Sequence, residues 1–258
     1  MAEYIFGAFF TMVLIVITYY AGETVWRERN IGMGDIVETT PIKNLTLYFP
    51  KIFALIAVTL VLTLVGMIFT VSYQLGKSYY HIEWSVYISL LSLEFIVPMI
   101  LMTILAVFIQ VLSPNKYIGM LIFVAFFIAN IVLAQLGLEH RMWRFARIPS
   151  ITYSDINLYG HFLEPAFWYN LYWIGLSTIL VVLGYSLWPR GTEFALKHRL
   201  RSIASNMSGK GQLTAVFGLL AFIGAGTVIY YNTRVLNTFT SQDARMDLQA
   251  EYERKYAV

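Results

Sequence analysis

Six long apolar runs constrain this chain more than any other feature. Each is uninterrupted and close to 20 residues long, and a helix of about 20 residues crosses the roughly 30 Å hydrocarbon core of a bilayer. The runs do not alternate at period two, as the strands of a closed barrel would, so helices are the only spanning structure available. We place the spans at about residues 3–20, 52–73, 86–111, 117–137, 167–188 and 213–231.

The composition agrees with this assignment. The chain has 258 residues, 58% apolar and only 13% charged, whereas soluble domains are about 45–50% apolar and about 25% charged. The absence of cysteine excludes disulfides, thiol nucleophiles and thiolate metal sites. The net charge of +3 is spread over loops and forms no basic patch for nucleic acid. The fold class predicted is therefore an all-α integral membrane protein with about six transmembrane helices.

The basic residues divide unequally between the two sets of loops. Loops 21–51, 113–116 and 189–212 hold Arg27, Arg29, Lys43, Lys51, Lys116, Arg190, Lys197, Arg199, Arg201 and Lys210. The opposite loops hold Lys77, Arg141, Arg144 and Arg147, with four more in the C-terminal tail. By the positive-inside rule, the first set is cytoplasmic and both termini are extracytoplasmic.

The segment 22–41 follows the first span on the predicted cytoplasmic side. Its charges alternate in sign, apolar residues recur at Ile31, Ile36 and Val37, and Thr40-Pro41 ends the element because a residue before proline disfavours the helical conformation. These features predict a short helix lying against the membrane face. From the residues alone, a plain connector between two spans remains an open alternative.

The stretch GETVWRERNIGMGDIVETTPIKN resembles the ABC-2 type permease family of ABC transporters. More narrowly, it resembles permeases fused to a C-terminal zinc aminopeptidase domain in some bacteria. Further pieces fit that subgroup and extend the resemblance over almost the whole chain: NKYIG, LGLEHRMWRF, YSDINLYGHF, LWPRGTEFALKHRL, YYNTRVLN and AEYERKYA.

The resemblance implies a permease domain over residues 1–231 and an extracytoplasmic helical stalk over 232–258. Six spans form a half in that family, with the coupling helix between the second and third. Only one span precedes segment 22–41 here, so we expect a half that lacks its first span and has one extra C-terminal span, as a fragment of a longer fusion. The residues expected to contact the ATPase are Trp26, Arg27, Glu28, Arg29 and Asp35.

The implied partners are an ABC ATPase subunit that holds ATP and Mg, a second permease half or another copy of this chain, and the bacterial inner membrane. The chain has no glycine-rich phosphate loop of the Gly-x-x-x-x-Gly-Lys-Ser/Thr type and no His-Glu-x-x-His pair. We therefore expect it to hold no cofactor and to catalyse no reaction itself.

Polar residues inside the spans are a second group of candidates. Glu94 lies in the third span, where a charge costs about 2.5–3.5 kcal/mol on insertion scales. It should face the bundle interior, with Gln110, Asn130 and Gln135 as candidate partners. A conduit or proton-linked role and interhelical packing both remain open. Pro98, one turn later, predicts a kink.

Loop 138–166 is rich in aromatic and charged residues. One interpretation is an outer gate that includes Glu139, His140, Tyr153 and Asp155, as the resemblance supports. An amphipathic surface loop anchored by Trp143 and Tyr153 is the alternative, and a metal site formed by Glu139, His140, Asp155 and His161 is a further hypothesis.

Three smaller features complete the predictions. Gly218, Gly224 and Gly226 in the last span permit close helix packing. The run Lys197–Arg201 is interpreted as a contact for anionic lipid or as a second ATPase contact. Ser241 is a candidate N-cap of a helical tail.

The leading functional hypothesis is the membrane-spanning subunit of an ABC transporter. The alternatives are the anchor of an extracytoplasmic aminopeptidase and a proton-linked secondary transporter.

Overall fold

A computed structural model of the chain describes residues 2–78, 80, 84–149, 151, 159–189, 196–201, 203, 207–237 and 239–256. The part so described contains helices, turns and bends and no strand. Six of its helices are long and apolar enough to cross a membrane. The elements are α1 (Ala2–Asn30), α2 (Gly34–Thr39), α3 (Asn44–Gly76), α4 (Trp84–Leu90), a π-helical turn (Leu91–Ile96), α5 (Val97–Leu112), α6 (Lys116–Gln135), α7 (Leu163–Ser186), α8 (Leu196–Arg201), α10 (Gly209–Tyr230), a second π turn (Tyr231–Leu236) and α11 (Gln242–Tyr256), with 3-10 turns at Arg141–Trp143 and Gly160–Phe162.

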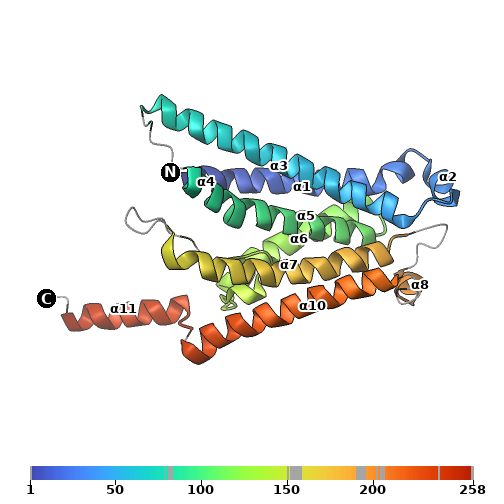
Figure 1. The fold of residues 1–258 in the computed structure, drawn as a ribbon. Coiled ribbons are helices and arrows are strands. Elements are labelled where there is room, and N and C mark those ends of the chain that lie inside the picture. Colours follow the sequence, from blue (N-terminus) through green and yellow to red (C-terminus); the bar gives the residue numbers. More distant parts are fainter. Residues whose placement is uncertain are drawn as a thin grey trace.

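The long helices form one bundle with α5 at its centre (Figure 1). Helix α5 contacts α1, α3, α6 and α7, whereas the chief neighbour of α10 is α7. Helices α2 and α8 lie at one end of the bundle, and α11 extends beyond the other end. The segments predicted to share the basic side therefore meet at one end of the molecule.

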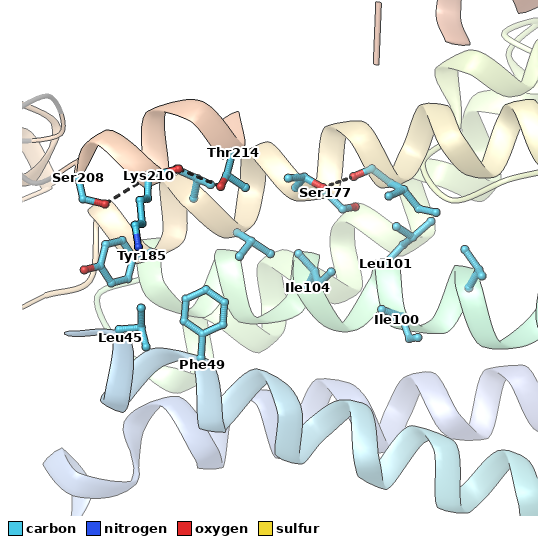
Figure 2. A pocket seen from close by; sticks show the side chains of 16 residues that line it. Leu45, Phe49, Ile100, Leu101, Ile104, Ser177, Tyr185, Ser208, Lys210 and Thr214 are labelled. Atoms are coloured by element: carbon cyan, nitrogen blue, oxygen red, sulfur yellow. Dashed lines mark hydrogen bonds between the residues drawn. The ribbon is translucent and has the colours of Figure 1, made fainter. Parts of the chain in front are cut away.

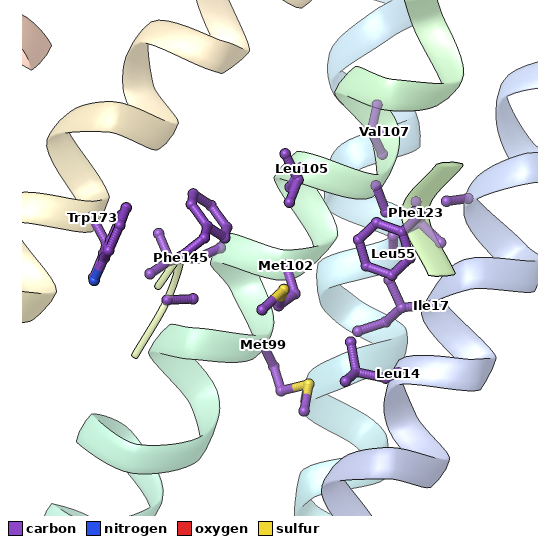
Figure 3. Close-up of a cluster of buried hydrophobic side chains, with 14 of the residues drawn as sticks. Leu14, Ile17, Leu55, Met99, Met102, Leu105, Val107, Phe123, Phe145 and Trp173 are labelled. Carbon is purple, nitrogen blue, oxygen red and sulfur yellow. The ribbon is translucent and has the colours of Figure 1, made fainter. Parts of the chain in front are cut away.

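The core surrounds α5, most of whose side chains are buried. Met99, Met102 and Val107 are almost fully buried, and Figure 3 shows such side chains between those of neighbouring helices. Phe145, from the loop after α6, also enters this core and meets Trp173 of α7 edge to face, with ring centroids 5.2 Å apart. Loop 138–166 is thus partly internal, which differs from an amphipathic loop on the surface.

The third span carries a π-helical turn where we predicted a kink. Pro98 has no amide hydrogen to donate to the carbonyl of Glu94, so the regular α-helical ladder cannot continue through this position. The turn Leu91–Ile96 lies immediately before the proline-containing helix. A single π turn of this kind locally widens a helix.

Helices α7 and α10 approach closely at a pair of glycines. A Cβ atom on Gly218 would lie 2.9 Å from the carbonyl oxygen of Gly175, and one on Gly175 would lie 2.6 Å from the amide nitrogen of Phe222. Gly226 faces Tyr172 in the same seam, whereas a Cβ on Gly224 would meet nothing within 4 Å. Close packing is confirmed for Gly218 and Gly226, whereas Gly224 makes no such contact within this chain.

Several helix ends differ from the predicted spans. Helix α1 continues ten residues beyond Tyr20 to Asn30, and the last span continues through its π turn to Leu236. A helix does not have to end where its apolar run ends, because the backbone bonds continue until a residue interrupts them. In the tail, Ser241 Oγ accepts a hydrogen bond from the amide of Ala244, which confirms the predicted N-cap.

Candidate functional site

We predicted a separate helix in the candidate coupling segment, residues 22–41. The structure divides this segment between two helices. Residues 22–30 are the last turns of α1, and only Gly34–Thr39 form a helix of their own, α2. The chain reverses at Gly32, whose φ of 74° is in the left-handed region that glycine adopts readily. Thr40 then takes the extended conformation expected before Pro41. We call residues 22–43 the α1–α2 corner.

Trp26 anchors the corner inside the bundle. Its side chain is buried, and its indole Nε1 donates a 3.1 Å hydrogen bond to Oε1 of Gln110 on α5. The amide of Gln110 in turn donates to the carbonyl of Lys116 at the start of α6 at 3.3 Å. A Cβ on Gly119 would lie 2.3 Å from Gln110 Oε1, so a small residue on α6 is needed for this amide to fit.

Two ion pairs tie the same end of α1 to its neighbours. Lys51 Nζ of α3 lies 2.5 Å from Glu28 Oε2 and also donates to the carbonyl of Thr24 at 2.7 Å. Lys116 Nζ of α6 lies 2.6 Å from Glu23 Oε1. Lys51 is only 8% exposed, so its pair lies where water screens the charges least.

Arg29 connects the corner to the segment that follows α7. Its guanidinium donates to the carbonyl of Pro189 at 3.3 Å and lies over the Trp26 ring, 5.3 Å from the centroid. A Cβ on Gly34 would lie 3.0 Å from Arg29 Cγ. The close packing at Gly34 therefore holds α2 against the end of α1.

Of the five residues predicted to contact an ATPase, the structure thus places three in internal contacts. Trp26, Glu28 and Arg29 bind other parts of the chain, whereas Arg27 is exposed. Asp35 lies in α2, and its side chain is outside the described part. Together with the Glu23–Lys116 pair, these contacts join the corner to α3, α5, α6 and the segment after α7.

No family model matches this chain, and no curated protein or solved structure matches it.

Glu94 lies in the π turn, half-buried, and Oε1 accepts a 3.0 Å hydrogen bond from the backbone amide of Ile151. It therefore faces the interior, as predicted. The predicted partners lie elsewhere: Gln110 bonds to Trp26, and Gln135 is exposed. Asn130 donates to the carbonyl of Phe145 at 3.0 Å. Within the described residues, none of these three amides is hydrogen-bonded to Glu94.

The candidate outer gate is described only in part. His140 is buried, and its Nε2 lies 3.2 Å from Thr233 Oγ1 at the end of the last span. Burial lowers the pKa of His140 below its ordinary 6.5, and the Arg234 and Arg141 guanidinium groups lower it further. Glu139 is half-buried. Tyr153 and Asp155 lie outside the described residues.

The hypothetical metal site has no counterpart in the described part of the chain, where no three His, Asp or Glu side chains come together. Asp155 and the side chain of His161 are outside it. The loop is instead held by backbone contacts: the indole of Trp173 donates to the carbonyl of Arg147 at 3.2 Å, and Arg144 Nε donates to the carbonyl of Asn130 at 3.2 Å.

Arg199 is a structural residue that sequence reasoning missed. We had placed it in a basic run facing lipid or an ATPase, but it is buried. Its Nη1 donates to the carbonyls of Val111 at 2.8 Å and Leu187 at 3.1 Å. These carbonyls terminate α5 and α7, where a cation is favoured by the helix dipole. The only signal in the sequence was that an apolar residue separates Arg199 from the next arginine of the basic run.

Proposed function

We propose that this chain is a multi-pass membrane protein that serves as the membrane-spanning subunit of an ATP-driven transporter. Membrane embedding is supported by the outer faces of its long helices. Phe53, Leu64 and Ile68 of α3 are each more than half exposed, as are Phe217 and Leu220 of α10. Apolar surface of this extent is rarely left to water in a soluble monomer.

The braced α1–α2 corner is the observation that carries the transport proposal. A helix turn at one end of the bundle presents the exposed Arg27, while Trp26, Glu28 and Arg29 connect the same turn to three other segments: α5, α3 and the segment after α7. A partner that pushes on such a corner displaces helices as rigid bodies, which is one way to open a site elsewhere. ATP and Mg would be held by the partner ATPase.

The first test is topology, and the absence of native cysteine makes it simple. Ile31→Cys is at the corner and Leu136→Cys is at the other end of the bundle, and both positions are exposed. In intact cells, a membrane-impermeant maleimide should label Leu136→Cys alone, and Ile31→Cys should react only after permeabilisation. Labelling of Ile31→Cys from outside would exclude a cytoplasmic motor contact.

The second test is the partner. Full-length tagged chain, affinity-purified from membranes of its own host, should bring down ATP-hydrolysing activity. Arg27→Glu should remove that activity, whereas Lys77→Glu, at the opposite end of the bundle, should retain it. Equal ATPase recovery with both variants would contradict the coupling role of the corner.

A tether for an extracytoplasmic domain, such as an aminopeptidase, is the second candidate. Helix α11 favours it, because its residues from Arg245 to Tyr256 are exposed along the whole length. A proton-linked transporter is distinguished by Glu94→Gln, which should remove pH-dependent transport only in that case.

A further inference from the structure

A cavity of about 440 Å³ lies between the start of α3 and helices α5, α7 and α10. Its walls are apolar over most of their area, with Phe49, Ile104 and Val182 among them. It opens to the outer surface, since its lining residues Leu45 and Ile174 are 55% and 42% exposed. In a bilayer, this opening would face lipid.

Two polar features interrupt the apolar wall. Lys210, in the first turn of α10, lies at the end of the cavity near the basic end of the bundle, and Figure 2 shows its Nζ extending toward Tyr185. Within the part of the chain that the structure describes, this ammonium has no acidic partner. Ser208, the N-cap of α10, lies beside it.

The second polar feature is the hydroxyl of Ser177. This side chain is 1% exposed and lines the cavity, yet its Oγ has no hydrogen-bond partner in the structure. Serines in membrane helices commonly bond to a carbonyl one turn back, as Thr178 does with Ile174 at 2.8 Å. The Ser177 oxygen itself has less than 1 Å² of accessible surface, so it is not open to a ligand in the cavity.

We propose that this cavity binds one anionic phospholipid of the surrounding bilayer, with its phosphate at Lys210 and one acyl chain along the apolar wall. The ligand is an attached lipid, distinct from any transported substrate.

Other occupants fit less well. A small inorganic anion would leave the apolar walls uncovered, and a neutral lipid would leave Lys210 without a counter-charge. The inference rests on the membrane embedding proposed above and does not depend on transport.

The test uses the full chain reconstituted in phosphatidylcholine vesicles with or without phosphatidylglycerol. A phosphatidylglycerol with a photoactivatable group on its acyl chain is crosslinked, and labelled peptides are mapped by mass spectrometry. We expect labels concentrated on α5, α7 and α10 at the cavity. Unlabelled phosphatidylglycerol should compete, whereas phosphatidylcholine and inorganic phosphate should not.

Matched variants identify the contacts. Lys210→Gln should lower cavity labelling by about fivefold, the effect of one basic residue on an anionic lipid, and Lys197→Gln, exposed at the same end, should not. Ile104→Trp should fill the cavity and abolish labelling, while Leu121→Trp on the exposed face of α6 leaves it unchanged.

Equal labelling of the cavity by phosphatidylcholine and no effect of Lys210→Gln would overturn the anionic-lipid assignment. Diffuse labelling over all outer faces, unchanged by Ile104→Trp, would overturn the cavity itself. Alkaline carbonate extraction separates these failures from a failure of embedding: a chain that stays in the membrane pellet while the cavity is unlabelled refutes the lipid site alone.

Discussion

The contact of Glu28 with Lys51 offers the sharpest test of how the α1–α2 corner is held. Lys51 is 8% exposed, and its ammonium has two acceptors, the Glu28 carboxylate and the carbonyl of Thr24. In Glu28→Gln the Lys51 ammonium keeps only two neutral acceptors, the carbonyl of Thr24 and the oxygen of the new side-chain amide. In Lys51→Met the charge is removed, and Glu28, whose side chain is 34% exposed, can be solvated.

The expected magnitudes follow from that asymmetry. A hydrogen bond to a charged group contributes about 1.5–3 kcal/mol, and partial exposure of Glu28 favours the lower part of that range. Glu28→Gln should therefore lower the free energy of unfolding by about 2 kcal/mol, and Lys51→Met by about 1 kcal/mol. The double variant should resemble Lys51→Met, which gives a coupling energy of about 2 kcal/mol.

The measurement is reversible denaturant unfolding in mixed micelles, followed by tryptophan fluorescence. Trp188 is a local reporter, because Lys51 Nζ lies 5.6 Å from its ring centroid. The matched control is Glu253→Gln on exposed α11, which should change stability by less than about 0.5 kcal/mol. If the two corner variants were additive within about 0.5 kcal/mol, the ion pair would not be what braces the corner.

Three further predictions concern other parts of the bundle. Arg199→Gln should lower the unfolding free energy by about 2–4 kcal/mol, because two helix-terminal carbonyls lose a charged donor; chemical unfolding checks this, and an effect below about 0.5 kcal/mol would refute the double cap. Because burial lowers the pKa of His140, the folded state favours the neutral imidazole. The contribution of this residue to stability is therefore complete above pH 6.5 and is lost as the pH falls toward the folded-state pKa. Thermal scans at several pH values should show this dependence in the unmodified chain and not in His140→Gln, and identical profiles would contradict it. Gly218→Leu should force α10 from α7 and cost about 1–3 kcal/mol, whereas Gly224→Leu, where the structure has open space, should be near neutral in the same unfolding assay.

The number and order of the long helices could be predicted because each needs an apolar run of membrane-spanning length. The ends of those helices could not. Helix α1 continues to Asn30 because the polar residues after Tyr20 keep helical backbone bonds, and the reversal comes only at Gly32. Hydrophobicity locates the part of a helix that suits a membrane, and it does not locate the residue where the helix stops.

The partners of the polar residues were harder still to predict. Gln110 was a candidate partner for Glu94 because it is a polar residue inside the membrane, yet its amide bonds to Trp26, 84 residues away. Arg199 is likewise 88 residues from the carbonyl of Val111 that it caps. Such contacts depend on how the helices are arranged around α5, and no local sequence pattern predicts that arrangement.

The way α10 attaches has a consequence for biogenesis. Its glycine seam is formed with α7, the long helix just before it in the sequence. Two consecutive spans can therefore pair as an antiparallel hairpin as soon as both have been inserted, without waiting for rearrangement of the helices made earlier. Ribosome-arrested chains that include α10 should already protect this seam from crosslinking to the insertion machinery.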